Sequence, residues 1–255
     1  MNKIKFLGTA GARFVVTRQL RKSGGIWLTI DDTNVLIDPG PGSLVRCLSS
    51  KPKLNPMNLD GVILTHRHID HSNDVNILIE AMTNGGFKKK GMVFAPADAL
   101  EDDPVIFNYI REHVEEIKVL HEGGRYNTGS ISFSTPVKHV HGVETYGLNI
   151  YGKKHSISLI TDTKYFKGLE SFYRGDILIL NIVLLENNDR IMHLSLHDAK
   201  KIISANKPRL CVLTHFGMNM LKAKPWDLAE NLSKKLDLKV IAASDGMELD
   251  LDQLI

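Results

Sequence analysis

The chain is poor in the features that build disulfide frameworks and membrane spans. Its 255 residues include only two cysteines, Cys47 and Cys211, which do not form a Cys-x-x-Cys metal pair. No apolar run approaches the roughly 20 residues that a membrane helix needs. The N-terminal segment MNKIKFL alternates lysines with apolar residues, as a strand does, and has no apolar signal-peptide core. We therefore expect no membrane association and a cytoplasmic protein.

Low-complexity tracts, long blocks of one charge and Pro/Ser-rich linkers are also missing. The length allows one large domain with a proper core, so we predict a single domain over residues 1–255. The net charge of +3 is mildly basic, which permits a phosphate-bearing substrate without demanding nucleic acid. One count is unusual, because the chain has 11 histidines. Their positions therefore become the main clue to function.

Short apolar runs alternate with segments of helical spacing. The strand-like runs are NVLID (34–38), GVILT (61–65), GMVFA (91–95), SISLIT (156–161), DILILNIV (176–183), RLCVLT (209–214) and KVIAA (239–243). Helices are predicted over 75–82, from Asp102 or Asp103 through Ile110, after a capping box at Ser195 and Asp198, and over 224–236. Hairpins and crossovers both occur, which predicts layered α/β with helices covering both sheet faces.

Several of the strand-like runs end on side chains that can bind metal, namely Asp38, His66, Asp162 and His215. In layered α/β folds, ligands bind just outside the ends of the strands. We therefore expect these four ends to converge on one site.

The densest motif is HRHIDH, which places His66, His68, Asp70 and His71 within six residues. Side chains two apart on an extended strand end point the same way, so His66 and His68 can grip one ion. Asp70 and His71 follow as the chain turns into a helix and can face a neighbouring ion. Imidazole and carboxylate are the usual ligands of zinc-like ions. The segment cannot enclose two ions alone, so further ligands must come from elsewhere.

Asp162 and His215 are the candidates for those further ligands. The carboxylate of Asp162 suits a bridge between two ions, and His215 suits a distal ligand. Taken singly, each also fits a buried polar residue that only forms hydrogen bonds.

Six segments together carry a family resemblance: HRHIDH, LIDPG, VHGVETYG, LITDT, HLSLHDA and LTHFG occur in this order. The chain resembles the metallo-β-lactamase superfamily of hydrolases, and within it most closely the phosphodiesterase and ribonuclease Z-like branch. The resemblance spans nearly the whole chain, from FLGTAGAR to SDGMEL. It implies a four-layer αββα sandwich, with helices outside two mixed β-sheets.

The resemblance also implies two divalent metal ions and their ligands. Zinc is favoured, and manganese or iron also suits this donor set. One ion would be held by His66, His68 and His141, the other by Asp70, His71 and His215, with Asp162 as the bridge. Asp38 would support the site without binding metal.

The third histidine of the first set has two candidates, His139 and His141. In the phosphodiesterase-like branch this histidine precedes a glycine by six residues, which fits His141 and Gly147. His139 is then expected to be a neighbour of the site rather than a supporting partner.

His193 is the residue that discriminates between the hydrolase classes. It stands two residues before Ser195, at the predicted start of a helix. The branch resembles this segment, which implies that His193 donates a proton to the leaving group while Asp70 orients the nucleophile. Alternatively, His193 only caps the helix or faces solvent.

The resulting expectation is a dinuclear phosphodiesterase acting on a small, cyclic or nucleotide phosphodiester through a metal-bridged hydroxide. One alternative is a tRNA 3′-processing endoribonuclease acting on an RNA end. It would lack the long arm of bacterial members, since only 21 residues separate His141 from Asp162. A thioester or acyl hydrolase and a non-catalytic metal-site protein are the others. A homodimer is compatible with the resemblance. The basic stretch containing Arg13, Arg18 and Arg21 has no assigned role.

Overall fold

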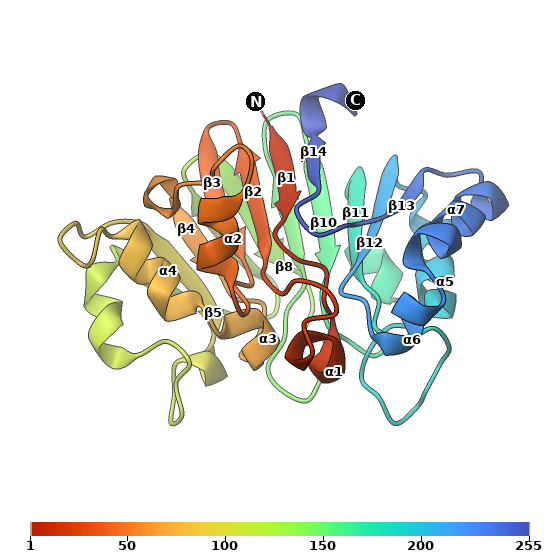
Figure 1. Cartoon of the computed structure of the whole chain (residues 1–255), viewed down its shortest axis with the longest axis horizontal. Helices are drawn as coiled ribbons and strands as arrows, with labels where there is room; N and C mark the ends of the chain where they lie inside the picture. The colour runs from red at the N-terminus through yellow and green to blue at the C-terminus, as the bar shows by residue number, and fades with distance from the viewer. Residues whose placement is uncertain (1, 255) are drawn as a thin grey trace.

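Two seven-stranded sheets face each other in the computed structural model, which describes residues 2–254 (Figure 1). The first sheet has the order β14-β1-β2-β3-β4-β5-β6. Its strands are β1 (Lys3–Phe6), β2 (Ile26–Ile30), β3 (Thr33–Ile37), β4 (Gly61–Ile63), β5 (Met92–Pro96), β6 (Glu116–Leu120) and β14 (Glu248–Asp250). It is mixed: β14, β1, β2 and β3 pair antiparallel, whereas β3 to β6 pair parallel.

The second sheet has the order β13-β12-β11-β10-β9-β8-β7. Its strands are β7 (Gly124–Thr128), β8 (Ile131–Thr135), β9 (Leu148–Tyr151), β10 (Ser156–Ile160), β11 (Ile177–Asn181), β12 (Leu210–Thr214) and β13 (Val240–Ala242). Here β7 to β10 form an antiparallel meander and β10 to β13 are parallel. The seven strand-like runs of the sequence therefore all correspond to observed strands.

Helices cover the outer faces of both sheets. On the first sheet these are α2 (Ser43–Ser49), α3 (Ile69–Ser72) and α4 (Val75–Met82), and on the second α5 (Leu196–Asn206) and α7 (Pro225–Leu236) (Figure 1). Two short helices, α1 (Ala12–Thr17) and α6 (Met218–Lys222), lie at one end of the sandwich. Single 3-10 turns occur at Pro56–Asn58, Ala97–Ala99, Leu169–Phe172 and Leu251–Gln253. The predicted αββα arrangement is confirmed.

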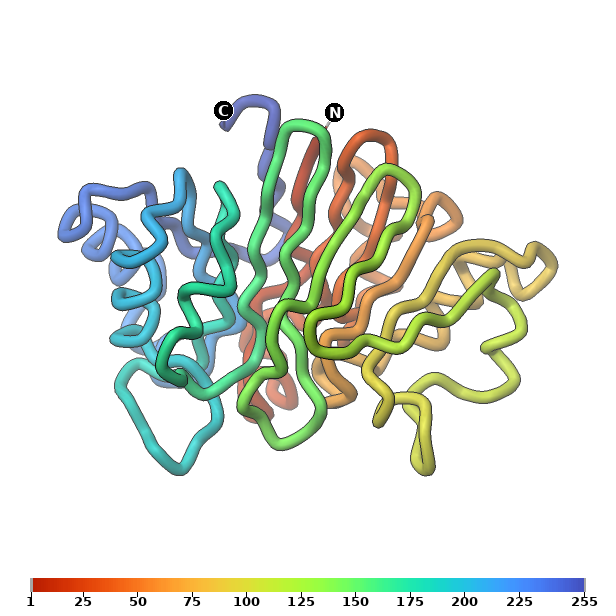
Figure 2. The backbone as a smooth tube through the Cα atoms, turned by 180° about the vertical axis from the view of Figure 1, so that it is seen from behind, coloured from red at the N-terminus to blue at the C-terminus, as the bar shows by residue number. Residues whose placement is uncertain are grey.

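Three hydrophobic clusters separate the four layers. The central one packs the inner faces of the sheets together, with Phe6 and Phe94 on one side and Phe133 and Leu148 on the other. A second cluster joins the first sheet to α4, and a third joins the second sheet to α5 and α7. The strands read as nearly continuous apolar runs because both of their faces are buried. Seen from behind, the green strands of the second sheet lie in front of the red and orange strands of the first sheet (Figure 2).

The helix predicted from Asp102 or Asp103 is wrong. The backbone of Asp102 has a φ of 41°, and the first helical turn is the 3-10 helix Asn108–His113. The side chain of Arg111 explains this, because its guanidinium donates to the carbonyls of Leu100 and Ile106 at 2.7 and 2.9 Å. A side chain that bonds to the backbone competes with the helical pattern. Ile106 is nevertheless buried, as its apolar character suggested.

None of the helices within residues 2–254 combines the length and the hydropathy required to cross a membrane.

Candidate metal centre

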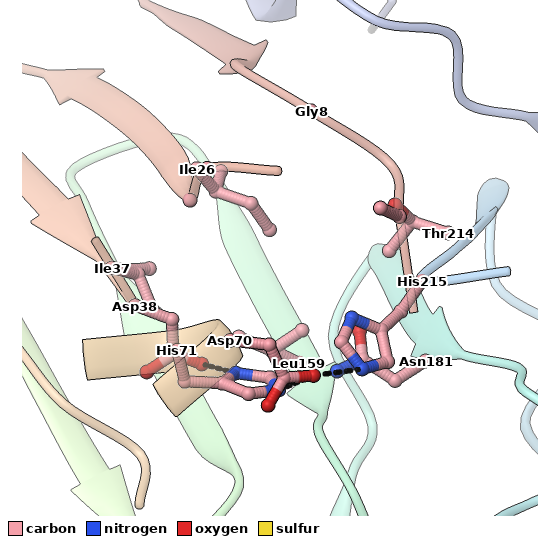
Figure 3. Close-up of a pocket in the computed structure, with 13 residues that line it drawn as sticks. Gly8, Ile26, Ile37, Asp38, Asp70, His71, Leu159, Asn181, Thr214 and His215 are labelled. Carbon is pink, nitrogen blue, oxygen red and sulfur yellow. Dashed lines mark hydrogen bonds and ion pairs between the residues drawn. The ribbon is translucent and has the colours of Figure 1, made fainter. Parts of the chain in front are cut away.

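The register of the parallel strands brings distant residues to one end of the sandwich. In the first sheet Ile37 pairs with Ile63, so Asp38 and His66 follow neighbouring strands. In the second sheet β10, β11 and β12 are aligned, so Asp162 follows one strand and His215 another. The expected convergence of strand ends is observed: Figure 3 shows Asp38 and His215 on either side of His71 and Asp70, and His66 Nε2 lies 3.9 Å from Asp162 Oδ2.

Two of these residues have a left-handed backbone: Asp38 has a φ of 53° and His215 a φ of 58°. Residues other than glycine adopt this conformation infrequently, and aspartate and histidine do so more often than most. In both cases the strand ends and the chain turns abruptly, which directs the side chain back toward the gap between the sheets (Figure 3).

The HRHIDH motif forms the junction between β4 and α3. His66 lies beyond the end of the strand, His68 immediately precedes the helix, and Asp70 and His71 lie within its single turn. Gly40 permits this turn to lie close to the β3–α2 loop, because a Cβ at Gly40 would lie 2.0 Å from the Asp70 carbonyl oxygen. The motif therefore supplies four inward-facing groups from one short segment.

Four overlapping groups of three potential ligands result: besides the two described next, Asp38 groups with His66 and His71, and His193 groups with His141 and Asp162. His66, His68 and His141 form the first, with His141 Nε2 only 3.1 Å from His68 Nδ1. Asp70, His71 and His215 form the second, where Asp70 Oδ2 lies 3.7 Å from His71 Nε2 and 3.6 Å from His215 Nε2. These are the two sets that the resemblance implied.

Asp162 lies between the two groups. Its Oδ2 atom lies 3.9 Å from His66 Nε2, 4.0 Å from His141 Nε2 and 3.5 Å from His71 Nε2. Its Oδ1 atom lies 3.4 Å from His215 Nε2. One carboxylate thus faces both sets of histidines, as a bridging ligand requires.

The chemistry of the buried nitrogens fits divalent metal ions. His66 Nε2, His71 Nε2 and His215 Nε2 are buried without a hydrogen-bond partner. Buried polar atoms are nearly always hydrogen-bonded, so a cluster of unpartnered imidazole nitrogens around one carboxylate needs another explanation. Their distances from the Asp162 oxygens are too long for good hydrogen bonds and leave space for a cation between them. The site is therefore built to hold metal.

Asp38 orients one of the histidines. Its Oδ2 lies 2.9 Å from His71 Nδ1 (Figure 3). The carboxylate is itself held by the backbone N–H and the hydroxyl of Thr65, both at 2.7 Å. This leaves Nε2 of His71 facing the site. A carboxylate that fixes the ring of a ligating histidine is the usual arrangement around such metals. This placement matches the supporting role expected of Asp38.

The other supporting contacts were missed at the sequence level. Asn181 donates to Asp162 Oδ1 at 2.9 Å, and the carbonyl of Met192 lies 3.0 Å from His141 Nδ1. Asn181 is the last residue of β11. Its place as a polar residue at the end of the apolar run DILILN is the one signal that could have identified it.

His139 is more than a neighbour, which corrects the expectation for that residue. Its ring is buried, with Nδ1 3.2 Å from the carbonyl of Asp162 and Nε2 2.7 Å from the hydroxyl of Tyr173. It therefore fixes the backbone that carries Asp162. The resemblance chose His141 as the ligand-type histidine, and the geometry agrees with that choice.

The pKa values of the ionisable side chains in the site are shifted in different directions. Burial lowers the pKa of His66 well below its usual value, with the neighbouring His71 adding to the effect. Burial alone would also lower the pKa of His71, but the carboxylates of Asp70, Asp162 and Asp38 raise it well above the usual value. Burial acts to raise the pKa of Asp162, yet the histidines around it, His215 first, hold it far below normal. An ionised carboxylate at the centre favours a bound cation.

His193 joins the site from the start of α5. Ser195 caps this helix in the predicted capping box, in which Ser195 N donates to Asp198 Oδ2 at 2.9 Å and Asp198 N donates to Ser195 Oγ at 3.1 Å. The cap fixes the chain two residues after His193, whose Nδ1 lies 3.5 Å from Asp162 Oδ2. This Nδ1 is buried without a hydrogen-bond partner. Burial lowers the pKa of His193 to about 4, although Asp162 opposes the shift.

Removal of the Asp38 carboxylate tests its orienting role. We expect Asp38→Asn to weaken binding of the metal held by His71 by roughly 10- to 100-fold, because the partner of Nδ1 is lost while the ligand remains. Metal affinity measured by competition with a chromophoric chelator checks this. Asp60→Asn is the matched control, since Asp60 accepts a backbone N–H elsewhere on the first sheet. Equal affinities in Asp38→Asn and in the unaltered protein would contradict the role.

Comparisons with known proteins agree with the fold. The model of the family described as the beta-lactamase superfamily domain matches residues 33–216. An uncharacterized protein of Methanocaldococcus jannaschii is 30% identical over 98% of this chain and 95% of its own length.

Solved structures with the same fold span nearly the whole chain. The metallo-β-lactamase fold protein YhfI of Bacillus subtilis has a TM-score of 0.80 and 20% identity, covering 97% of this chain and 98% of its own. A diphosphatase of the PhnP family has a TM-score of 0.72 and 21% identity, covering 98% of both chains. The short form of human tRNase Z has a TM-score of 0.69 and 17% identity, covering 98% of this chain and 99% of its own.

The family match and the ligand-type clusters lead to one conclusion. The fold implies divalent metal ions, and the clustered histidines and aspartates provide a place for them. The chain belongs to the beta-lactamase superfamily as a hydrolase, and it shares the metallo-β-lactamase fold with a PhnP-family diphosphatase and with human tRNase Z.

Proposed function

We propose that the protein is a dinuclear metal-dependent phosphodiesterase acting on small, cyclic or nucleotide phosphodiesters. The observation that carries this proposal is the placement of His193, whose Nδ1 is buried, unpartnered and 3.5 Å from Asp162 Oδ2. Hydrolysis of a phosphodiester expels an alkoxide, which needs a proton, and an imidazole beside the metal ligands can supply one. The names of the PhnP-family diphosphatase and of tRNase Z support phosphoryl chemistry for this fold.

The ligand sets follow from the geometry of the two clusters. His66, His68 and His141 would hold one ion, and Asp70, His71 and His215 the other, with Asp162 shared between them. Zinc suits these donors best, and manganese or iron are alternatives. When bound, two such ions lower the pKa of a water molecule toward neutrality and offset the negative charge that grows on the phosphoryl oxygens.

Side chains of the protein orient the attacking oxygen, supply the proton and hold the shared carboxylate. Asp70 is a member of the second ligand set and lies in the α3 turn, where its carboxylate can also orient the attacking oxygen. The imidazole of His193 can donate a proton to the departing oxygen. Asn181 holds one oxygen of Asp162, and His139 holds its carbonyl, so the shared carboxylate keeps its place during the reaction.

The negative charge of a bound phosphodiester bears on the state of His193. In the free protein the pKa of about 4 makes the imidazole largely neutral at pH 7. An anion in contact with the ring favours its protonated form, so substrate binding opposes the effect of burial. A bound phosphodiester therefore favours protonation of His193 relative to the free protein.

Metal removal and restoration test the proposal. We expect purified protein to hydrolyse bis(p-nitrophenyl) phosphate, to lose at least about 99% of this activity on chelation, and to recover it with zinc or manganese. Elemental analysis should find about two ions per chain in the active form. Protein that holds two ions and cleaves a thioester but no phosphodiester would make the acyl-hydrolase alternative the correct one.

A further inference from the structure

A groove of about 710 Å³ opens directly beside the candidate metal centre. One part of its wall is formed by residues of that centre: His68, Asp70, His141, Asp162 and His193. The remainder is dominated by apolar side chains: Phe14, Ile69, Val183, Leu184, Ile191 and Met192. The volume is in the range of sites for small organic molecules. A substrate that reacts at the centre must therefore lie against an apolar wall.

The apolar side chains at the mouth of this groove are exposed without a packing reason. Phe14 is 59% exposed and Ile69 is 70% exposed. Helix α1 is already anchored by Val15 and Val16, which are buried in a small cluster with Ala10. Phe14 adds nothing to that cluster and points outward. Grouped exposed apolar side chains in a concave site mark a place where a ligand binds.

The opposite wall is a loop that is tied at its base. The loop between β11 and α5 projects from the same end of the sandwich as α1 (Figures 1 and 2). Its base is closed by hydrogen bonds from Leu184 N to the Leu194 carbonyl at 3.1 Å and from Leu196 N to the Leu184 carbonyl at 2.9 Å. Ile191 and Met192, which are 38% and 45% exposed, are thus presented from an anchored segment.

The apolar wall continues away from the metal centre. A second hollow of about 230 Å³ shares Phe14, Leu184 and Ile191 with the first and extends to Met218. We call the joined apolar lining of the two hollows, from Phe14 to Met218, the apolar track. An extended apolar group could contact both hollows, whereas a compact polar one could not.

The charged side chains that line the groove favour a substrate with an anionic group at one end only. Arg13 and Arg190 line it, and the only carboxylates in its wall are Asp70 and Asp162, both of which belong to the metal centre. Positive potential at the mouth attracts an anionic substrate. The track between Phe14 and Met218 offers few partners for the hydroxyl groups of a sugar.

We propose that this groove binds the ester group that remains on phosphorus, and that the preferred substrates are phosphodiesters in which this group is an extended apolar chain. Phe14, Ile191 and Met192 are the residues that would determine the preference. The inference rests on the proposed phosphodiesterase function and goes beyond it by naming the substrate class.

A pair of esters with one common leaving group tests the preference. Methyl 4-nitrophenyl phosphate and octyl 4-nitrophenyl phosphate differ only in the group that stays on phosphorus. A fully buried methylene contributes about fourfold to binding, so we expect the octyl ester to have a kcat/KM at least about tenfold above that of the methyl ester, through a lower KM. Both esters must be used below the concentration at which the octyl ester aggregates.

Variants locate the effect in the groove. Phe14→Ala and Met192→Ala should each lower the octyl-to-methyl ratio of kcat/KM by about fivefold. Phe87→Ala is the matched control, because Phe87 is 88% exposed and lies outside the groove, and it should leave the ratio unchanged. Calorimetry of octylphosphonate binding to metal-free protein gives a readout without turnover, and Phe14→Ala should weaken that binding. Thermal unfolding of each variant checks that the fold is kept.

The outcomes separate this inference from the proposed function. Turnover of both esters with equal kcat/KM would overturn the apolar preference while leaving the phosphodiesterase proposal intact. No turnover of either ester by metal-loaded protein would remove the proposed function, whatever the groove binds. A third ester, thymidine 5′-(4-nitrophenyl phosphate), covers the alternative of a nucleoside. If it exceeds the octyl ester and resists Phe14→Ala, the substrate class proposed here is wrong.

Discussion

Asp162→Asn is expected to release both metal ions and to lower phosphodiester hydrolysis by roughly 10³-fold or more. The reason is that Asp162 is the carboxylate shared by the two ligand sets, and residues that act as one catalytic unit lose most of their effect when one is removed. The carboxylate faces His66, His71 and His141 through Oδ2 and His215 through Oδ1, all within 4.0 Å. Removal of the Asp162 charge leaves the site with one negative group fewer to attract the cations. The asparagine keeps the shape of the side chain, so packing around it changes little.

The measurements for Asp162→Asn are metal content, activity and thermal unfolding, each made on protein purified with zinc present. Asp198→Asn is the matched control, because Asp198 is also a buried aspartate but serves the cap of α5. Loss of part of that cap should lower stability by about 1 kcal/mol and leave the metal content unchanged. Retention of two ions and most of the activity in Asp162→Asn would show that this carboxylate is not the shared ligand.

The local part of the site could be predicted from the sequence because its residues are neighbours in the chain. His66, His68, Asp70 and His71 are carried by one strand end and one helical turn, so their clustering follows from local geometry. Asp162 and His215 could be predicted because they end apolar runs, and parallel strands in register end at one edge. The fold itself followed from the family resemblance rather than from periodicity.

The remaining contacts depend on tertiary packing, which a single sequence does not encode locally. Nothing in the neighbourhood of Tyr173 indicates that its hydroxyl meets the ring of His139, 34 residues away. The apolar wall at Phe14 is equally hidden, because an exposed phenylalanine and a core phenylalanine look alike in a sequence. The wrong helix at Asp102 has the same origin: Arg111 binds the carbonyls of Leu100 and Ile106, of which a helix through Ile110 would have used that of Ile106.

His193→Ala should leave both metal ions in place and still lower phosphodiester hydrolysis, by an amount that depends on the leaving group. Its Nδ1 is 3.5 Å from Asp162 Oδ2, and His193 groups with His141 and Asp162 as ligand-type residues, but neither of the two proposed ligand sets includes it. A proton donor is worth roughly 10²- to 10⁴-fold when the leaving group is a strongly basic alkoxide. A p-nitrophenolate is stable as an anion, so the loss on bis(p-nitrophenyl) phosphate should be substantially smaller.

The pH dependence gives a second test of the same role. Burial lowers the pKa of His193 to about 4 in the free protein, and a bound phosphodiester anion raises it in the complex. The protonated donor is present below the pKa of the complex and is lost above it. We therefore expect kcat for an alkyl ester to fall on the alkaline side, and this limb to be absent in His193→Ala.

His197→Ala is the matched control for His193→Ala. His197 is an exposed histidine in the first turn of α5, four residues after His193, and it does not line the groove. It should keep wild-type rates with both kinds of ester. Equal losses in His193→Ala for alkyl and nitrophenyl leaving groups would show that His193 acts on a phosphoryl oxygen and not on the departing one, because a donor to the departing oxygen must be sensitive to its basicity. Loss of metal in His193→Ala would instead show that His193 is a metal ligand. Its distance from Asp162 does not by itself require that role.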